Sequence, residues 1–342
     1  MPRRAATGPR TTVRPLVLGI ESTAHTFAAS VVSGEGAILS DVRDAYRAPE
    51  GAGIHPREAS RHHAEVAPSV VRKALLDAGA GMEEMSAVAY SAGPGLGPCL
   101  RVGAVVARAL SSYYSRPLVP VNHAVGHIEL AALLTAASDP ACVLVSGGHT
   151  AIVAAAGSRW RFFGETLDIT IGQLFDQFGR HLGLASPCGP AVEAMASGAT
   201  KYLPVPYTVK GNDMSFSGAL THAKRLLDRE RKEDVAYSLQ ETAMAMLCET
   251  TERALAFTEK KELMVAGGVA ANRRLAAMLG DVCGRQGARL MVPDGKFAGD
   301  CGPQIAWLGA RLFSSGVSCS PEEGYVRQSW RLDEVEVPWR GC

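Results

Sequence analysis

The stretch LVLGIESTAHTFAASVV, residues 16–32, holds two short apolar runs on either side of a polar turn. Its residues 16–20 form an apolar run, 21–26 are mostly small or polar, and 27–32 read as a strand again. A strand, a short polar turn and a second strand predict a β-hairpin. We therefore expect the ordered part of the chain to open with two paired strands.

A related pattern returns in ACVLVSGGHTAIVAAAG, residues 141–157. A predicted strand over 143–145 is followed by the turn SGGHT at 146–150 and then by a second predicted strand over 151–155. This weak internal repeat predicts two similar domains, each of which opens with a hairpin.

A third turn at a strand end lies in ELMVAGGVAANRRLAAML, residues 262–279, where a strand over 263–266 meets Gly267 and Gly268. Asn272 follows near the start of a helix. Glycine lets a ligand approach the backbone, and helix N-termini favour phosphate. Each turn alone is more simply a tight turn, but three at strand ends favour a nucleotide cleft between two domains. The P-loop and dinucleotide motifs are absent from the sequence.

The amino-acid composition limits the class of protein. The chain has 342 residues, 47% of them hydrophobic and 20% charged, which suits a soluble protein of two moderate domains. No apolar run approaches the roughly 20 residues of a membrane span. The eight cysteines are scattered without a C-x-x-C pair, which is typical of a reducing compartment. A net charge of +1 lacks the basic footprint of a stand-alone nucleic-acid binder.

The first fourteen residues, MPRRAATGPRTTVR, hold four arginines and no acid. Without an apolar core they do not form a secretory signal. They predict a short disordered basic arm, with a mitochondrial presequence as the alternative.

Two histidines lie four residues apart in VPVNHAVGHIEL, residues 119–130. On a helix His123 and His127 share one face, so both imidazoles can point at one ion. Two ligands do not make a site, because Zn²⁺ or Fe²⁺ normally takes three or more. Asp300, just before a helix with Pro303 in its first turn, is the carboxylate to test; taken alone it is more simply an N-cap.

Two longer helices are also predicted. One covers 55–78 and ends at Gly79 as its C-cap, and its adjacent His62 and His63 are expected to be solvated surface residues. The other, within 233–261, carries a stripe of Met and Leu that is most simply core.

Five motifs together resemble one family, the tRNA N6-adenosine threonylcarbamoyltransferases. They are NHAVGHIEL at 122–130, VSGGHT at 145–150, GNDMSFSG at 211–218, AGGVAANRRL at 266–275 and GDCG at 299–302. The resemblance runs from about residue 16 to about residue 327. GNDMSFSG and GIHPREASRHHAE at 53–65 resemble the archaeal and eukaryotic branch, whose members work within the KEOPS complex.

The resemblance implies an α/β fold of two RNase H-like domains, as in the actin, sugar-kinase and Hsp70 ATPases, with a nucleotide and metal site in the cleft. It places the basic arm at 1–13, the first domain at 14–140 and the second at 141–298. A C-terminal helix within 299–330 then returns to the first domain.

The resemblance also implies the site residues. One divalent metal per subunit, Fe²⁺ favoured and Zn²⁺ possible, would be bound by His123, His127 and Asp300. An adenine nucleotide, threonylcarbamoyl-AMP or ATP, would meet a second set of residues. This set is Leu144, Val145, Ser146, Gly147 and Gly148 at the phosphates, and Asp176, Gly189, Glu193 and Asn272 around the ribose and base. Archaeal relatives often have tyrosine where this chain has Leu144, so no fourth protein ligand is expected from that position.

The implied reaction transfers the threonylcarbamoyl group from threonylcarbamoyl-AMP to N6 of the adenosine 3′ of the anticodon, position 37, in tRNAs that read ANN codons. The partners implied are tRNA and KEOPS subunits, including a kinase-like ATPase and a small dimerising subunit, in the cytoplasm and without a membrane. No catalytic side chain is assigned beyond the metal site; His25 and His149 could assist, but are more simply turn residues.

Two other classes of protein remain open. A metalloprotease of the H-E-x-x-H type needs glutamate after the first histidine, where this chain has Ala124. An ATP-binding kinase or regulator of the same fold is the stronger rival. It would need no histidine pair, so a measurement of bound metal separates the two.

Overall fold

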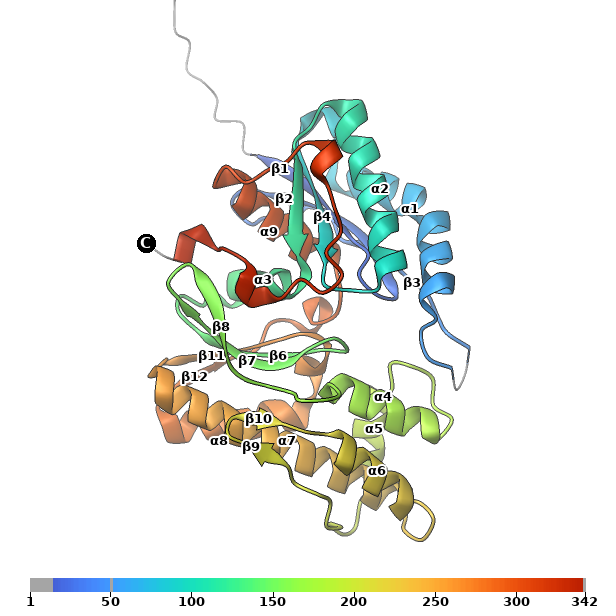
Figure 1. The fold of residues 1–342 in the computed structure, drawn as a ribbon, viewed down its shortest axis with the longest axis vertical. Coiled ribbons are helices and arrows are strands. Elements are labelled where there is room, and N and C mark those ends of the chain that lie inside the picture. Colours follow the sequence, from blue (N-terminus) through green and yellow to red (C-terminus); the bar gives the residue numbers. More distant parts are fainter. Residues whose placement is uncertain (1–14, 50–51, 341–342) are drawn as a thin grey trace, which may run out of the picture.

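The computed structural model describes residues 15–49 and 52–340, and the predicted basic arm at 1–13 lies outside them. Two five-stranded sheets form the frame of this part of the chain. They lie in the upper and lower halves of Figure 1, with helices packed around both. The predicted α/β class is confirmed.

The first sheet has the strand order β3-β2-β1-β4-β5. Its strands are β1 (Leu16–Glu21), β2 (Thr26–Ser33), β3 (Val42–Ala45), β4 (Met85–Gly93) and β5 (Leu118–Asn122). The helices that follow within this half are α1 (Pro56–Ala78), α2 (Gly97–Tyr114) and α3 (His123–Thr135).

The second sheet has the order β12-β11-β6-β7-β8. Its strands are β6 (Ala141–Val145), β7 (Thr150–Ala156), β8 (Arg159–Glu165), β11 (Glu262–Ala266) and β12 (Arg289–Met291). Its helices are α4 (Ile171–His181), α5 (Gly189–Ala196), α6 (Ser217–Leu226), α7 (Lys232–Thr258) and α8 (Arg273–Gln286). A two-stranded ribbon of β9 (Val209–Lys210) and β10 (Asp213–Met214) lies beside it.

The two sheets repeat one pairing scheme. β1–β2 and β2–β3 are antiparallel, and β1–β4 and β4–β5 are parallel. In the second sheet β6–β7 and β7–β8 are antiparallel, and β6–β11 and β11–β12 are parallel. Both predicted hairpins are therefore confirmed, and the sequence repeat reflects a structural one.

The late helix α9 (Gly302–Ser314) packs against β1, β2 and β4 of the first sheet. Gly19 permits this close approach, because a Cβ added there would lie 2.2 Å from the backbone nitrogen of Ala306. The chain thus returns to its first half after completing the second, and α9 brings Asp300 back beside α3.

The predicted long helices are present. α1 ends at Gly79, which adopts the left-handed conformation expected of its C-cap. Met244, Met246 and Leu247 of α7 are buried in the core of the second half. Among the described residues, no helix combines the length and apolar character that a membrane span requires. The seven described cysteines are all free thiols.

The prediction for His63 was wrong. Its side chain is fully buried, and its Nε2 lies 3.1 Å from the carbonyl oxygen of Ala24, in the turn between β1 and β2. Only His62 is near the surface, where its Nε2 lies 3.0 Å from Asp44. Adjacent positions on a helix face different directions, and α1 turns one of the two against the sheet.

The C-terminal segment 325–340 spans both halves. The amide of Arg327 donates to the carbonyl of Ala92 in β4, and the amide of Val337 donates to Ser158 beside β8. Arg331 forms an ion pair with Glu165 of β8. This segment therefore ties the first sheet to the second.

Candidate metal and nucleotide site

Three predicted metal residues meet where the two halves face each other. His123 and His127 lie in the first two turns of α3, and Asp300 directly precedes α9. One ligand atom from each lies within 4.8 Å of the others. The Nε2 atoms of His123 and His127 are 3.5 Å and 3.3 Å from Asp300 Oδ1. Cys301, rather than Asp300, occupies the N-cap of α9, so this carboxylate is not used as a helix cap.

A carboxylate that the sequence analysis missed holds His123 in place. Nδ1 of His123 lies 2.9 Å from Oε2 of Glu21, at the end of β1. The backbone amide and hydroxyl of Thr23 both donate to the other oxygen of Glu21. Metal-binding histidines usually donate their second ring N–H to such a carboxylate, which leaves the first nitrogen for the ion. The signal for this carboxylate in the sequence was the position of Glu21, an acidic residue directly after the apolar run 16–20.

The protonation of the site follows from these charges. Burial lowers the pKa of His123, but the negative charges of Glu21 and Asp300 outweigh burial and raise it to about 9. Burial lowers the pKa of His127. Burial favours the neutral form of Asp300, yet His123 and His127 together hold its pKa below its ordinary value. A divalent cation would take over the positive charge that these carboxylates already attract.

His149 lies near this cluster and is partly exposed to solvent. Burial, reinforced by the charges of His123 and His127, lowers the pKa of His149 to about 3. Its Nδ1 has no hydrogen-bond partner among the described residues.

The donor set of the cluster fits a metal ion. Two imidazoles, one carboxylate and a supporting carboxylate suit Zn²⁺ or Fe²⁺.

The turn SGGHT at 146–150 faces this cluster from the other half. Ser146 is buried, whereas Gly147 and Gly148 are exposed. The Ser146 hydroxyl accepts hydrogen bonds from the amides of Gly148 and His149, at 3.2 Å and 3.0 Å. Leu144 and Val145, also predicted to meet phosphate, instead lie buried within β6, paired with β7. The outward-facing part of the predicted phosphate site is therefore 147–148.

Two further segments converge on this turn. Gly267, after β11, has φ of 98°, and a Cβ there would lie 2.3 Å from the carbonyl oxygen of Val145. The N-terminus of α4 reaches it as well, because the Thr170 hydroxyl donates to the carbonyl of Gly147 at 3.0 Å. Parallel strands β6 and β11 end at the same edge, so their glycine turns meet.

The remaining predicted nucleotide residues lie around the N-termini of α5 and α8. Asp176 Oδ1 accepts from the amide of Cys188, and Glu193 Oε1 accepts from the amide of Arg273. Asn272 caps α8, since its side chain accepts from the amide of Leu275 at 2.9 Å. Gly189 begins α5, and a Cβ there would meet open space. In each of the two carboxylates one oxygen thus accepts a hydrogen bond from a backbone amide, and the second oxygen can accept one from a ligand.

The GNDMSFSG motif has a structural role that the sequence did not reveal. Asp168 accepts hydrogen bonds from the hydroxyls of Ser215 and Ser217 and from the amides of Phe216 and Ser217. Burial raises the pKa of Asp168, but these four donors outweigh it and lower the pKa to about 2. The motif therefore surrounds a carboxylate 43 or more residues earlier in the chain and fixes the entry to α6.

Comparison with known proteins decides the family. The sequence profile described as TsaD, tRNA N6-adenosine threonylcarbamoyltransferase, matches residues 37–307. The chain belongs to this family. A transferase of that name from Pyrobaculum neutrophilum is 50% identical over 95% of this chain and 96% of its own length. One from Thermofilum pendens is 49% identical, over 95% and 97%. This chain is accordingly a transferase.

Other similar proteins extend the comparison. A probable bifunctional tRNA threonylcarbamoyladenosine biosynthesis protein from Methanosarcina barkeri is 47% identical over 94% of this chain but only 59% of its own length. Among solved structures, HypF of T. kodakarensis has a TM-score of 0.64 at 13% identity, over 89% of this chain and 48% of HypF. Component A of the (R)-2-hydroxyglutaryl-CoA dehydratase of Acidaminococcus fermentans has a TM-score of 0.58 at 12% identity, over 88% and 99%. The fold is the predicted one, that of the actin, sugar-kinase and Hsp70 ATPases.

Gly148→Val tests the predicted phosphate turn. A Cβ at Gly148 would have only Ser146 Oγ near it, at 4.0 Å, so the fold should accept the branched side chain. The methyl groups would occupy the space in which a phosphate approaches the backbone. We expect nucleotide affinity measured by calorimetry to fall at least tenfold, a loss of about 1.4 kcal/mol, with little change in the unfolding temperature. Gly284→Val, on the exposed side of α8 where an added Cβ would also meet open space, is the control and should bind nucleotide as the wild type does. Equal affinity of Gly148→Val and wild type would refute this placement.

Proposed function

We propose that this chain transfers the threonylcarbamoyl group from threonylcarbamoyl-AMP to N6 of adenosine 37 in tRNAs that read ANN codons, which forms t6A. The observation that carries the proposal is the cluster of buried His123 and His127 with partly buried Asp300, opposite an exposed glycine turn, in a chain of this family. A group-transfer enzyme needs an activated carbonyl held beside its acceptor, and this arrangement suits that task.

In this proposal three residues would hold the metal, and two others would orient one of them. His123, His127 and Asp300 would hold one divalent cation, which we propose is iron, with zinc as the alternative. When bound, the cation supplies Lewis-acid chemistry, either by polarising the carbonyl or by neutralising phosphate. Glu21 accepts the Nδ1 proton of His123 and so keeps Nε2 directed at Asp300. The amide Nε2 of Gln304 in α9 lies 2.9 Å from the same Nδ1; since both nitrogens then carry protons, Gln304 restricts rotation of the ring by contact and not through a hydrogen bond.

The second half would hold the nucleotide. The turn at 147–148 and the N-terminus of α4 converge there, and backbone amides and helix N-termini attract phosphate. Asp176 and Glu193 each have one carboxylate oxygen that the fold does not use, and such oxygens accept hydrogen bonds from ribose hydroxyls. Asn272 is buried as a helix cap, so we propose that it shapes the adenosine pocket rather than donating freely.

We further propose the domain division 14–140, 141–298 and 299–330. It is supported by two separate sheets within 16–122 and 141–291 and by the packing of α9 on the first of them. The cleft between the sheets would then hold the two substrates.

Two other functions have less support. A metalloprotease would need a free glutamate as general base, but Glu129, the nearest acid after His127 on α3, is held by Arg340 and Trp339. A kinase or regulator of this fold would have no use for the histidine pair with its supporting carboxylate.

The test of the proposed function is a transfer assay with threonylcarbamoyl-AMP and tRNA, with and without partner subunits. ATP-dependent phosphorylation of a small acceptor without any tRNA product would favour the kinase instead.

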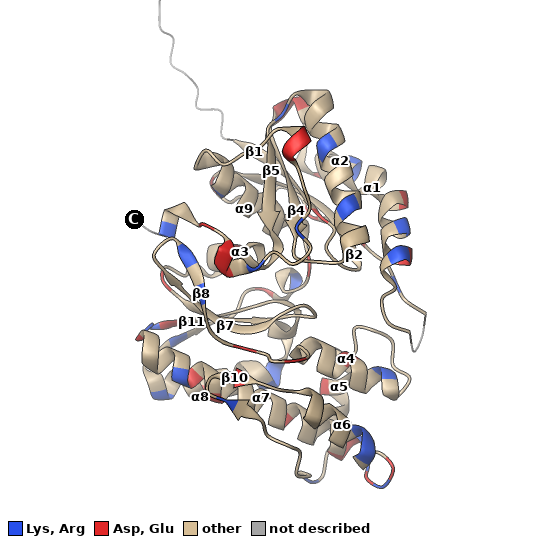
Figure 2. Ribbon diagram, viewed as in Figure 1, with Lys and Arg blue, Asp and Glu red and all other residues tan. Residues whose placement is uncertain are grey.

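The partners proposed are tRNA and KEOPS-type subunits, including a kinase-like ATPase and a small dimerising subunit, in the cytoplasm. Proteins that bind tRNA alone usually cluster lysine and arginine against the phosphates. This chain has 35 basic and 34 acidic residues. Figure 2 shows them interspersed over both halves. Partner subunits would therefore supply most phosphate contacts.

We accordingly expect the isolated chain to bind tRNA weakly, and the assembled complex to bind it tightly. The salt slope of log K should be shallow for the chain alone and steeper for the complex, since each neutralised phosphate adds about 0.7–0.9 to the slope. Deleting residues 1–13 should lower affinity slightly without stopping transfer. The measurement is tRNA binding against salt concentration. Tight, selective binding by the isolated chain at physiological salt would contradict this expectation.

A further inference from the structure

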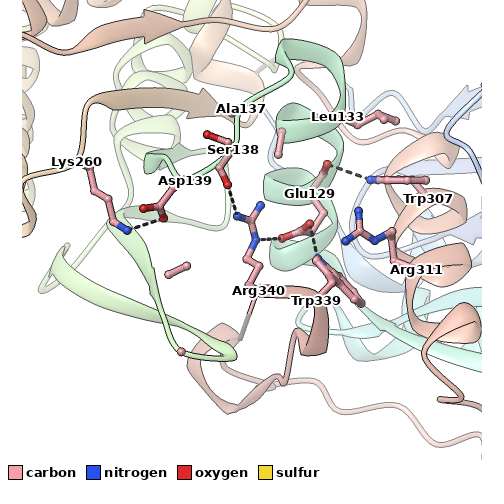
Figure 3. Close-up of a pocket in the computed structure, with 13 residues that line it drawn as sticks. Glu129, Leu133, Ala137, Ser138, Asp139, Lys260, Trp307, Arg311, Trp339 and Arg340 are labelled. Atoms are coloured by element: carbon pink, nitrogen blue, oxygen red, sulfur yellow. Dashed lines mark hydrogen bonds and ion pairs between the residues drawn. The ribbon is translucent and has the colours of Figure 1, made fainter. Parts of the chain in front are cut away.

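A second cavity lies away from the cluster of His123, His127 and Asp300. Its volume is about 590 Å³, within the range of pockets that bind small molecules. We call it the basic pocket, defined by Glu129, Lys260, Trp307, Arg311, Trp339 and Arg340 (Figure 3). These residues come from α3, from the link between α7 and β11, from α9 and from the C-terminal segment. The basic pocket is therefore bordered by both halves of the molecule.

Most charges in the basic pocket are already paired. Glu129 accepts from Arg340 Nε at 2.7 Å and from the indole N–H of Trp339 at 3.1 Å. Lys260 forms an ion pair with Asp139, which also lines the cavity. Figure 3 marks both pairs with dashed lines.

Arg311 differs from these residues. Its guanidinium carbon lies 4.5 Å from the centre of the Trp339 ring and 5.4 Å from that of Trp307. Within the described part of the chain, no carboxylate comes within ion-pair distance of it. Burial lowers the pKa of Arg311, only partly opposed by Glu129, and Arg340 lowers it further. The basic pocket thus contains one positive charge without a matching anion.

We propose that the basic pocket binds a small organic oxyanion, a phosphate or a carboxylate, with Arg311 as its principal partner. A guanidinium offers paired N–H donors in the fork geometry that such groups accept. The two indoles fix the guanidinium plane, so little side-chain freedom is lost on binding. The cavity has room for several atoms beyond the anionic group, and Lys260 can turn from Asp139, which is largely exposed, to the ligand.

This site is separate from the transfer chemistry, so its test does not depend on the proposed function. The probes are ribose 5-phosphate and succinate, which distinguish a phosphate from a carboxylate ligand. Binding to the full chain is followed by tryptophan fluorescence at constant ionic strength, because Trp307 and Trp339 line the basic pocket. We expect saturable binding of at least one probe with a Kd on the order of 1 mM or below.

Arg311→Gln should weaken that binding at least tenfold, as expected when a charged hydrogen-bond partner is lost. Arg61→Gln on the exposed face of α1 is the matched control and should bind as the wild type does. If Arg311→Gln does not fold, Lys260→Gln at the rim replaces it and should weaken binding severalfold. The proposal is overturned if neither probe shows saturable binding, or if the variant binds as tightly as the wild type.

Discussion

Replacing His127 with alanine should remove the bound metal and abolish transfer. His127 would supply one of the three proposed ligands and is almost fully buried beside Asp300, so alanine leaves the proposed site with only two protein ligands. A Lewis-acid contribution of several kcal/mol corresponds to a loss of about a thousandfold or more, since each 1.4 kcal/mol or so is a factor of ten. His123→Ala should behave in the same way. The measurements are metal content by elemental analysis and the transfer rate.

The control for this experiment is His181→Ala, an exposed histidine at the end of α4. It should keep full metal content and activity. Circular dichroism and the unfolding temperature of the metal-free proteins show whether the variants fold. Full metal content together with full activity in either His123→Ala or His127→Ala would mean that these residues do not bind the metal.

Glu21→Gln should weaken metal binding by about 10- to 100-fold, the usual effect of removing the carboxylate that orients a metal-binding histidine. Glutamine has the same shape and can still accept from Thr23, so the loss should come from charge rather than packing. Glu58→Gln, on the surface of α1, is the control. Metal affinity is measured by competition with a chelator, and an unchanged affinity would exclude the orienting role.

The stability of the same variant should depend on pH in a way that a packing defect would not produce. In the metal-free protein Glu21 helps to raise the pKa of His123 to about 9, above its ordinary value of 6.5. A raised pKa stabilises the folded state below pH 6.5, and that stabilisation is lost as the pH rises through 9. Metal-free wild type should therefore lose stability between these values, and Glu21→Gln should lose less. Parallel stability curves for the two proteins would contradict this account.

Some features followed from the sequence because they depend on local chemistry. The hairpins at 16–32 and 141–157 combine apolar strands with small polar turns, and their strands form as expected. Gly79 ends α1 because glycine adopts the left-handed conformation without strain. The spacing of His123 and His127 ensures one shared face once α3 forms. The five motifs also indicate the family.

Other features depend on contacts between distant parts of the chain, and local patterns do not contain them. His63 is buried because α1 packs over the β1–β2 turn, although its neighbour His62 stays near the surface. Glu21 precedes His123 by 102 residues, and Asp168 lies 47 to 49 residues before the serines that surround it.

Local patterns in the sequence therefore predict the repeat of two similar halves and the residue types that suit a metal. Which side chains meet depends on the packing of distant segments. Asp300 reaches His127 because α9 returns to the first sheet, where Gly19 leaves room for its backbone. The basic pocket likewise exists only because the C-terminal segment crosses both halves and brings Trp339 and Arg340 against α3. Propensity and spacing act over a few residues, whereas packing joins residues by shape and charge wherever the fold brings them together.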